Sequence, residues 1–173
     1  MNKGKWIFFA TLLIVLAGFS MQLFAQVKDA PASVAAAMLL KVAVFEKNVS
    51  STGEINIFVL GADEVADELK KGVGKPVGKS TLKSVDTGSD LPSSKPTILF
   101  CGDAAKLDDV LGYCKSNKVL SVTGAPENVS KGIALGFGVG EDNKPKILLN
   151  LTASSECGLD WNPAILKVAQ TVK

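Results

Sequence analysis

The sequence predicts a single three-layer α/β/α domain with a mixed, mostly parallel sheet of about five to six strands, a Rossmann-like arrangement. Short apolar runs at residues 55–60 and 97–101 lack polar alternation, which is typical of strands buried on both faces of a parallel sheet. Amphipathic segments at 63–71 and 104–115 follow these runs and predict helices. This alternation of strand and helix is the main basis for the predicted fold.

The remaining elements follow from local patterns along the chain. Pro31 opens an Ala- and Leu-rich helix over 32–48, and Gly and Pro breakers separate the later segments. Polar residues 140–143 between two apolar runs predict an antiparallel hairpin. The full expected order is helix 32–48, strand 55–60, helix 63–71, strand 81–85, loop 86–95, strand 97–101, helix 104–115, strand 118–123, hairpin strands 133–139 and 146–151, and a closing helix from Pro163.

Residues 1–25 have the pattern of a secretory signal peptide. Lys3 and Lys5 precede a long apolar run, and the segment ends in a small residue, Ala25, as signal peptidase requires. We expect cleavage after Ala25, which leaves one α/β domain over residues 26–173. Such a protein would be periplasmic.

Composition argues against most enzymatic and nucleic-acid functions. The chain contains no histidine and no arginine, which removes imidazole-based catalysis and metal binding and the bidentate guanidinium clamp. Its 19 basic and 17 acidic residues become nearly balanced once the signal peptide is removed. We therefore expect no catalytic residues, no cofactor, no metal and no nucleic-acid partner.

Three cysteines, Cys101, Cys114 and Cys157, form an odd set for an exported protein. A helix over 104–115 would carry Cys114 away from Cys101, which disfavours a disulfide between them. The thiols are expected to be small buried hydrophobes, while a bridge between two chains of a homodimer stays open. An alternative is a thiol-based enzyme or redox sensor, in which Cys157 near a helix start would have a lowered pKa.

Two further motifs resemble functional sites, but neither is expected to bind phosphate or to take part in catalysis. The Gly78-Lys79-Ser80 sequence resembles part of a phosphate-binding loop, but position 73 is valine instead of the required glycine. Asp108-Asp109 and Glu141-Asp142 are paired carboxylates on a helix face and in a hairpin loop, where we expect them to be solvated.

Polar and glycine residues follow three of the predicted parallel strands. They are Gly61 and Asp63, Gly102 and Asp103, and Thr123. Turn and helix-capping chemistry explains these residues, but open α/β sheets also bind ligands at the carboxyl ends of their strands. A small-ligand site shared among the five residues is therefore the alternative.

Trp161 is the one tryptophan after the signal peptide, and it stands just before the predicted closing helix. It is expected either to pack that helix onto the domain or to be an exposed anchor for a protein partner.

Across about residues 38–170, the chain resembles the exported YfiR-like proteins. The resemblance is densest at the carboxyl end, in the apolar run 147–151, Gly158-Leu159 and the segment 165–169, and it includes 119–122. It implies a periplasmic regulator that restrains a membrane-bound signalling protein, often a diguanylate cyclase, by binding its extracytoplasmic sensor region. No catalytic residues come with it.

The sequence thus predicts an exported, noncatalytic signalling regulator, for which a sensor histidine kinase is an alternative target. The second hypothesis is a periplasmic binding protein for a small neutral or cationic molecule at the strand-end loops.

Overall fold

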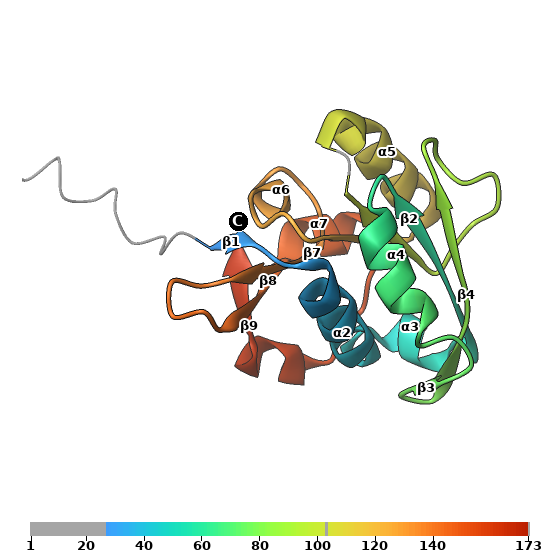
Figure 1. Cartoon of the computed structure of the whole chain (residues 1–173), viewed down its shortest axis with the longest axis horizontal. Coiled ribbons are helices and arrows are strands. Elements are labelled where there is room, and N and C mark those ends of the chain that lie inside the picture. The colour runs from blue at the N-terminus through green and yellow to red at the C-terminus, as the bar shows by residue number, and fades with distance from the viewer. Residues whose placement is uncertain (1–26, 103, 173) are drawn as a thin grey trace, which may run out of the picture.

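One mixed sheet occupies the centre of the molecule (Figure 1). The computed structural model describes residues 27–102 and 104–172, and the sheet of this part has nine strands in the order β3-β4-β2-β5-β6-β7-β8-β9, with β1 paired to β7. The strands are β1 Lys28–Asp29, β2 Glu54–Leu60, β3 Pro76–Val77, β4 Ser80–Gly88, β5 Ile98–Cys101, β6 Leu120–Thr123, β7 Leu135–Val139, β8 Pro145–Asn150 and β9 Ala169–Val172. The predicted signal peptide lies outside the described residues.

The sheet is mostly parallel, as predicted. Strands β4, β2, β5, β6 and β7 run parallel to one another, and β8 returns antiparallel to β7 as the expected hairpin. The predicted strand count is too low, because β1 and β3 have two residues each and β9 was expected to be helical. Segments as short as β1 and β3 carry no alternation from which a strand can be predicted.

Helices cover both faces of the sheet, with α2 and α4 on one face and α5 on the other (Figure 1). The helical segments are α2 Ala32–Val42, η2 Ala43–Phe45, α3 Lys47–Ser51, α4 Asp63–Lys70, η3 Ala104–Lys106, α5 Leu107–Asn117, α6 Glu127–Ser130, α7 Leu151–Glu156 and η4 Pro163–Lys167, where η marks a 3₁₀ turn. This three-layer arrangement confirms the predicted fold class.

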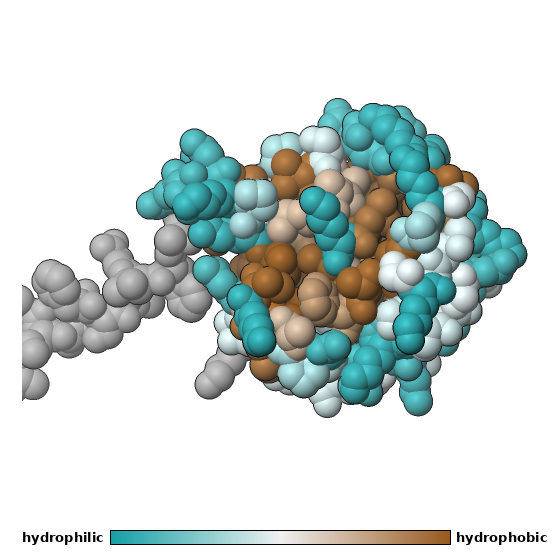
Figure 2. Space-filling view, turned by 90° about the horizontal axis from the view of Figure 1, so that it is seen from below, coloured by the Kyte–Doolittle hydropathy of each residue, from teal (hydrophilic) through white to brown (hydrophobic). Residues whose placement is uncertain are grey.

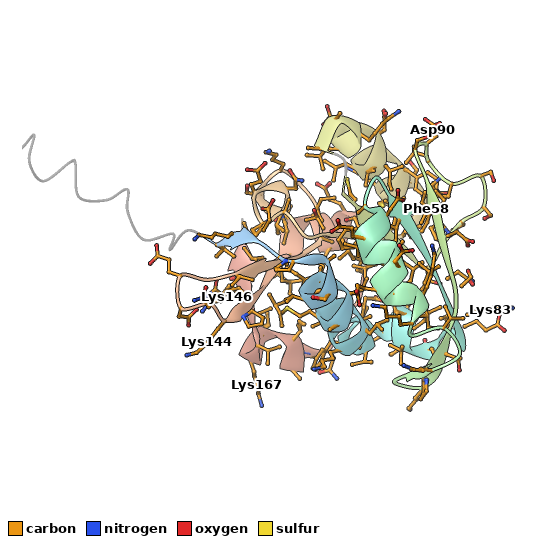
Figure 3. All side chains as sticks on the ribbon, in the orientation of Figure 1. Phe58, Lys83, Asp90, Lys144, Lys146 and Lys167 are labelled. Atoms are coloured by element: carbon orange, nitrogen blue, oxygen red, sulfur yellow. The ribbon has the colours of Figure 1, made fainter. Side chains whose placement is uncertain are left out.

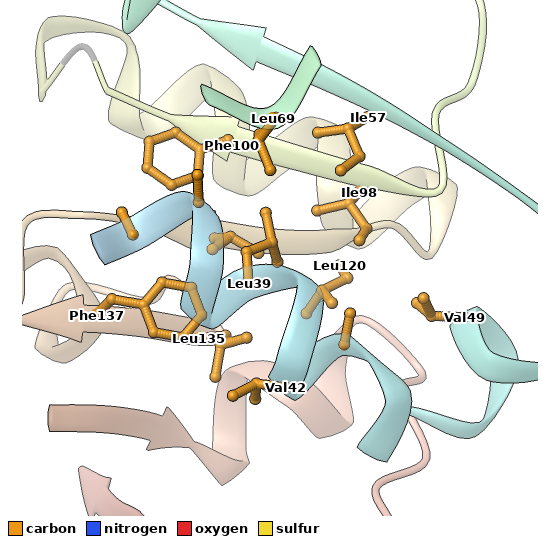
Figure 4. Close-up of a cluster of buried hydrophobic side chains, with 14 of the residues drawn as sticks. Leu39, Val42, Val49, Ile57, Leu69, Ile98, Phe100, Leu120, Leu135 and Phe137 are labelled. Atoms are coloured by element: carbon orange, nitrogen blue, oxygen red, sulfur yellow. The ribbon is translucent and has the colours of Figure 1, made fainter. Parts of the chain in front are cut away.

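The central strands divide their side chains between two cores. In β5, Ile98 and Phe100 face the larger core under α2, while Leu99 and Cys101 face the smaller core under α5. Leu39 of α2 is fully buried in the larger core (Figure 4). Because both faces of β5 are buried, its sequence is a continuous apolar run.

Three predicted elements differ from the structure. Residues 86–88, expected in a loop, extend β4 to Gly88. The closing helix is only the short turn η4, after which the chain forms β9 parallel to β8. The first helix, expected to continue to residue 48, ends as α2 at Val42.

A buried carboxylate explains where the first helix ends. Glu46 has extended backbone angles and caps α3 by accepting the Val49 N–H at 2.7 Å. Its carboxylate also accepts the Asn48 amide at 3.0 Å and the Asp160 N–H at 2.8 Å. Glu46 is fully buried, so these charge-assisted hydrogen bonds offset the loss of water. They also join the end of η2 to the chain that precedes η4.

We expect Glu46→Ala to lower the free energy of unfolding by on the order of 3 kcal/mol, because it leaves three N–H donors without their charged acceptor. Urea unfolding followed by circular dichroism measures this. Glu64→Ala, on the exposed face of α4, is the matched control and should change stability by less than about 0.5 kcal/mol. Equal effects of the two substitutions would contradict the role given to Glu46.

Candidate functional site

The sheet reverses its strand order between β2 and β5, because the chain passes from β2 to β4 on one side and later to β5 on the other. In open α/β sheets, ligands usually bind beyond the strand ends at such a point. Gly61 and Gly102 do meet there, and the Gly102 N–H donates to the Leu60 carbonyl at 2.8 Å. The contact is tight: a Cβ at Gly102 would lie 2.4 Å from Ala62 Cβ and 2.7 Å from the Gly61 carbonyl oxygen.

The other predicted ligand residues have structural partners or stand apart. Thr123 is fully buried, and its hydroxyl donates to the Cys101 carbonyl at 2.9 Å and accepts the Ala125 N–H at 3.1 Å. Asp63 is exposed in the first turn of α4, where its negative charge interacts favourably with the helix dipole. Asp103 lies outside the described residues. Three cavities in the described part of the chain, of about 390, 360 and 270 Å³, are lined by other residues.

The largest of these cavities lies at the opposite, amino-terminal edge of the parallel strands. It has a volume of about 390 Å³, within the usual range for small-molecule sites. Its walls come from α3, the beginnings of β2 and β6, the residues just before β5, and the loop after α7. The lining residues are Glu46, Asn48, Val49, Thr52, Glu54, Asn56, Lys95, Pro96, Thr97, Lys118, Leu120 and Leu159. Sequence patterns missed this cavity, because no motif unites segments so distant along the chain.

The smaller core holds all three thiols, as buried residues that form no disulfide. Burial raises the pKa of the Cys114 thiol, and the neighbouring Cys157 and Cys101 raise it further. Burial also raises the pKa of Cys157, and the Glu156 carboxylate adds to this effect while Lys115 opposes it. The expected lowering of the Cys157 pKa is wrong, because Cys157 is buried and lies at the C-cap of α7 and not at a helix start.

Trp161 lies between the cavity region and η4. It forms an isolated antiparallel bridge with Glu46, and its ring is partly buried against the larger core. Among the described side chains, its indole Nε1 is the one buried polar atom without a hydrogen-bond partner. A role as a partner anchor stays a prediction.

An exposed apolar patch follows Trp161 at the lower side of the molecule. Leu166, in η4, and Val168, just after it, are 51% and 53% exposed. Figure 3 shows the intervening Lys167 pointing away from the domain at this side. Figure 2, seen from the same side, shows hydrophobic residues gathered in the middle of the face with hydrophilic residues around them. We call Leu166, Lys167 and Val168 the η4 patch.

We expect Gly102→Ala to destabilise the protein by about 1–3 kcal/mol, because the added methyl group would overlap Ala62 and the Gly61 carbonyl. The control is Gly112→Ala in α5, where a Cβ would meet nothing within 4 Å. This control should stabilise the helix by up to about 1 kcal/mol. Thermal unfolding of both variants distinguishes the outcomes, and a neutral Gly102→Ala would mean that space is left at the strand ends.

The raised pKa values of Cys114 and Cys157 predict slow alkylation of the folded protein. Iodoacetamide attacks the thiolate, and raising the pKa lowers the thiolate fraction at any pH below it. At about pH 8 we expect both thiols to react roughly tenfold or more slowly than in urea, as measured by mass spectrometry of peptides. Fast modification of folded Cys157 would instead support a reactive thiol.

The comparisons with known proteins agree with this fold. No curated protein matches the chain. A conserved domain protein from Vibrio cholerae O1 biovar El Tor strain N16961 has a similar crystal structure, with a TM-score of 0.58 and 14% identity over 83% of this chain. An ABC domain from Streptococcus pneumoniae, solved in complex with L-Trp, gives a TM-score of 0.51 with the same identity and coverage. In each case the match spans only 60% of the solved chain, so these structures support the fold alone.

One family model matches residues 32–170, nearly the whole described domain, and its description is YfiR/HmsC-like. The resemblance noted in the sequence is thereby confirmed. This chain belongs to the YfiR/HmsC-like family.

Proposed function

We propose that this protein is an exported, noncatalytic regulator that binds the extracytoplasmic sensor region of a membrane signalling protein and restrains it. A diguanylate cyclase is the first expected target and a sensor histidine kinase the second. Membership of the YfiR/HmsC-like family supports this role. The absence of histidine and arginine also supports a binding function over a catalytic one. In the described part of the chain, no helix is long and apolar enough to cross a bilayer.

The observation that carries the proposal is the η4 patch. Leu166 and Val168 are the two most exposed large hydrophobic residues of the described chain, and they lie two positions apart. Lys167 between them takes part in no ion pair among the described residues. An apolar partner surface bordered by carboxylates would match both features.

In this mechanism the regulator acts by occupying the sensor region of the membrane protein. While the η4 patch covers the sensor region, the membrane protein stays in its inactive conformation. A signal that favours the unbound state of either protein then shifts the population towards activity.

The test is crosslinking in native membranes, followed by purification of the tagged protein and mass spectrometry of what it retains. We expect a membrane cyclase or kinase to be recovered with the unchanged protein and lost with Leu166→Asp. Val73→Asp is the matched control, because Val73 is 45% exposed but precedes β3, at the opposite edge of the sheet from β9. It should retain the partner.

Recovery of the same membrane protein by both variants would place the contact elsewhere on the domain. Recovery of no membrane signalling protein by the unchanged chain would overturn the proposed function. Circular dichroism of the two variants checks that each is folded.

A further inference from the structure

The polar side chains that line the cavity at the amino-terminal ends of the strands differ in whether they already have hydrogen-bond or ion-pair partners. Its two carboxylates are already engaged: Glu46 accepts three N–H groups, and Glu54 forms an ion pair with Lys83. Thr97 accepts the Asn56 N–H through its hydroxyl oxygen at 3.2 Å. These contacts stabilise the wall and leave the acidic groups little capacity for a ligand.

The two lysines that line the cavity, in contrast, have no ion-pair or side-chain hydrogen-bond partner among the described residues. Lys95 and Lys118 both line it, and neither forms an ion pair or a side-chain hydrogen bond within the described residues. The lining lysines and glutamates are equal in number, and Lys83, which lies outside the lining set, adds a positive charge beside Glu54. The balance of charge around the cavity is therefore positive.

Both lysines are exposed, and each has a restricted backbone conformation. Lys118 ends α5 with a left-handed φ of 53°, a conformation that costs a non-glycine residue about 1 kcal/mol or more. Its methylene groups lie over Gly158, since a Cβ built there would meet Lys118 Cδ at 3.5 Å. Lys95 precedes the buried Pro96, whose ring restricts the backbone of Lys95 to extended angles.

We propose that this cavity binds a small organic anion, with its carboxylate or phosphate group held by Lys95 and Lys118. The hydroxyl of Thr52, which has no hydrogen bond among the described residues, is a neutral donor at the same wall. Half-buried Leu159 supplies an apolar contact for the rest of the ligand. This site lies at the amino-terminal ends of the strands, opposite the loops that follow their carboxyl ends. The proposal does not depend on the membrane partner.

The test is a titration of the purified, isotope-labelled protein with sodium succinate and, separately, with inorganic phosphate, at constant ionic strength maintained with sodium chloride. We expect amide signals of Thr52, Thr97 and Lys118 to shift and to saturate. Saturation with succinate alone assigns a carboxylate ligand, and saturation with phosphate alone assigns a phosphate ligand. Saturation with neither anion overturns the proposal.

Lys118→Gly is the decisive variant, because it removes the cation and at the same time relieves the left-handed backbone. We expect a melting temperature equal to or above that of the unchanged protein, together with a loss of affinity of about tenfold or more. Lys95→Met should weaken binding similarly. Lys79→Met is the control, since Lys79 is an exposed lysine outside the cavity, and it should bind normally. Unchanged affinity in a folded Lys118→Gly would overturn the assignment.

Discussion

The carboxylate of Glu46 is the interaction on which the functional regions of this domain depend. It is buried without an ion pair among the described residues, and three N–H donors take the place of water around it. Two of these donors belong to the start of α3, and the third comes from Asp160, more than a hundred residues later. The carboxylate therefore fixes the turn after α2 and the segment that leads into η4. Glu46 is therefore part of the wall of the cavity at the amino-terminal ends of the strands. Its hydrogen bond with Asp160 also holds the segment that precedes the η4 patch.

The sheet separates the possible functional surfaces from one another. At the carboxyl ends of β2 and β5, the contact between Gly102 and Gly61 fills the place where open α/β sheets usually bind ligands. The cavity lies instead at the amino-terminal ends, where residues of α3, of the beginnings of β2 and β6 and of the loop after α7 line it. This open α/β sheet thus has the largest of the three cavities at the opposite ends of its strands, which is consistent with function being decided by sites and not by folds.

The elements predicted well from the sequence are those whose environment is uniform. Strands β2 and β5 are buried on both faces, so their residues form continuous apolar runs, and α4 has one apolar face and one charged face. The predicted first helix is longer than α2 because Glu46 is not among the usual N-cap residues, and nothing local marks the break. The sequence predicts helix where β9 forms, because the pairing of β9 with β8 is not encoded in its own four residues.

The sequence by itself determined the fold class, the family resemblance and the absence of imidazole and guanidinium groups, because periodicity and composition can be read from the chain without its tertiary contacts. Only the tertiary structure decided which polar side chains have hydrogen-bond or ion-pair partners and which have none. Lys118, Lys95 and Glu46 are ordinary residues in the sequence. They become distinct because distant segments meet at the amino-terminal ends of the strands, where buried Glu46 gains three N–H donors and exposed Lys95 and Lys118 line a cavity.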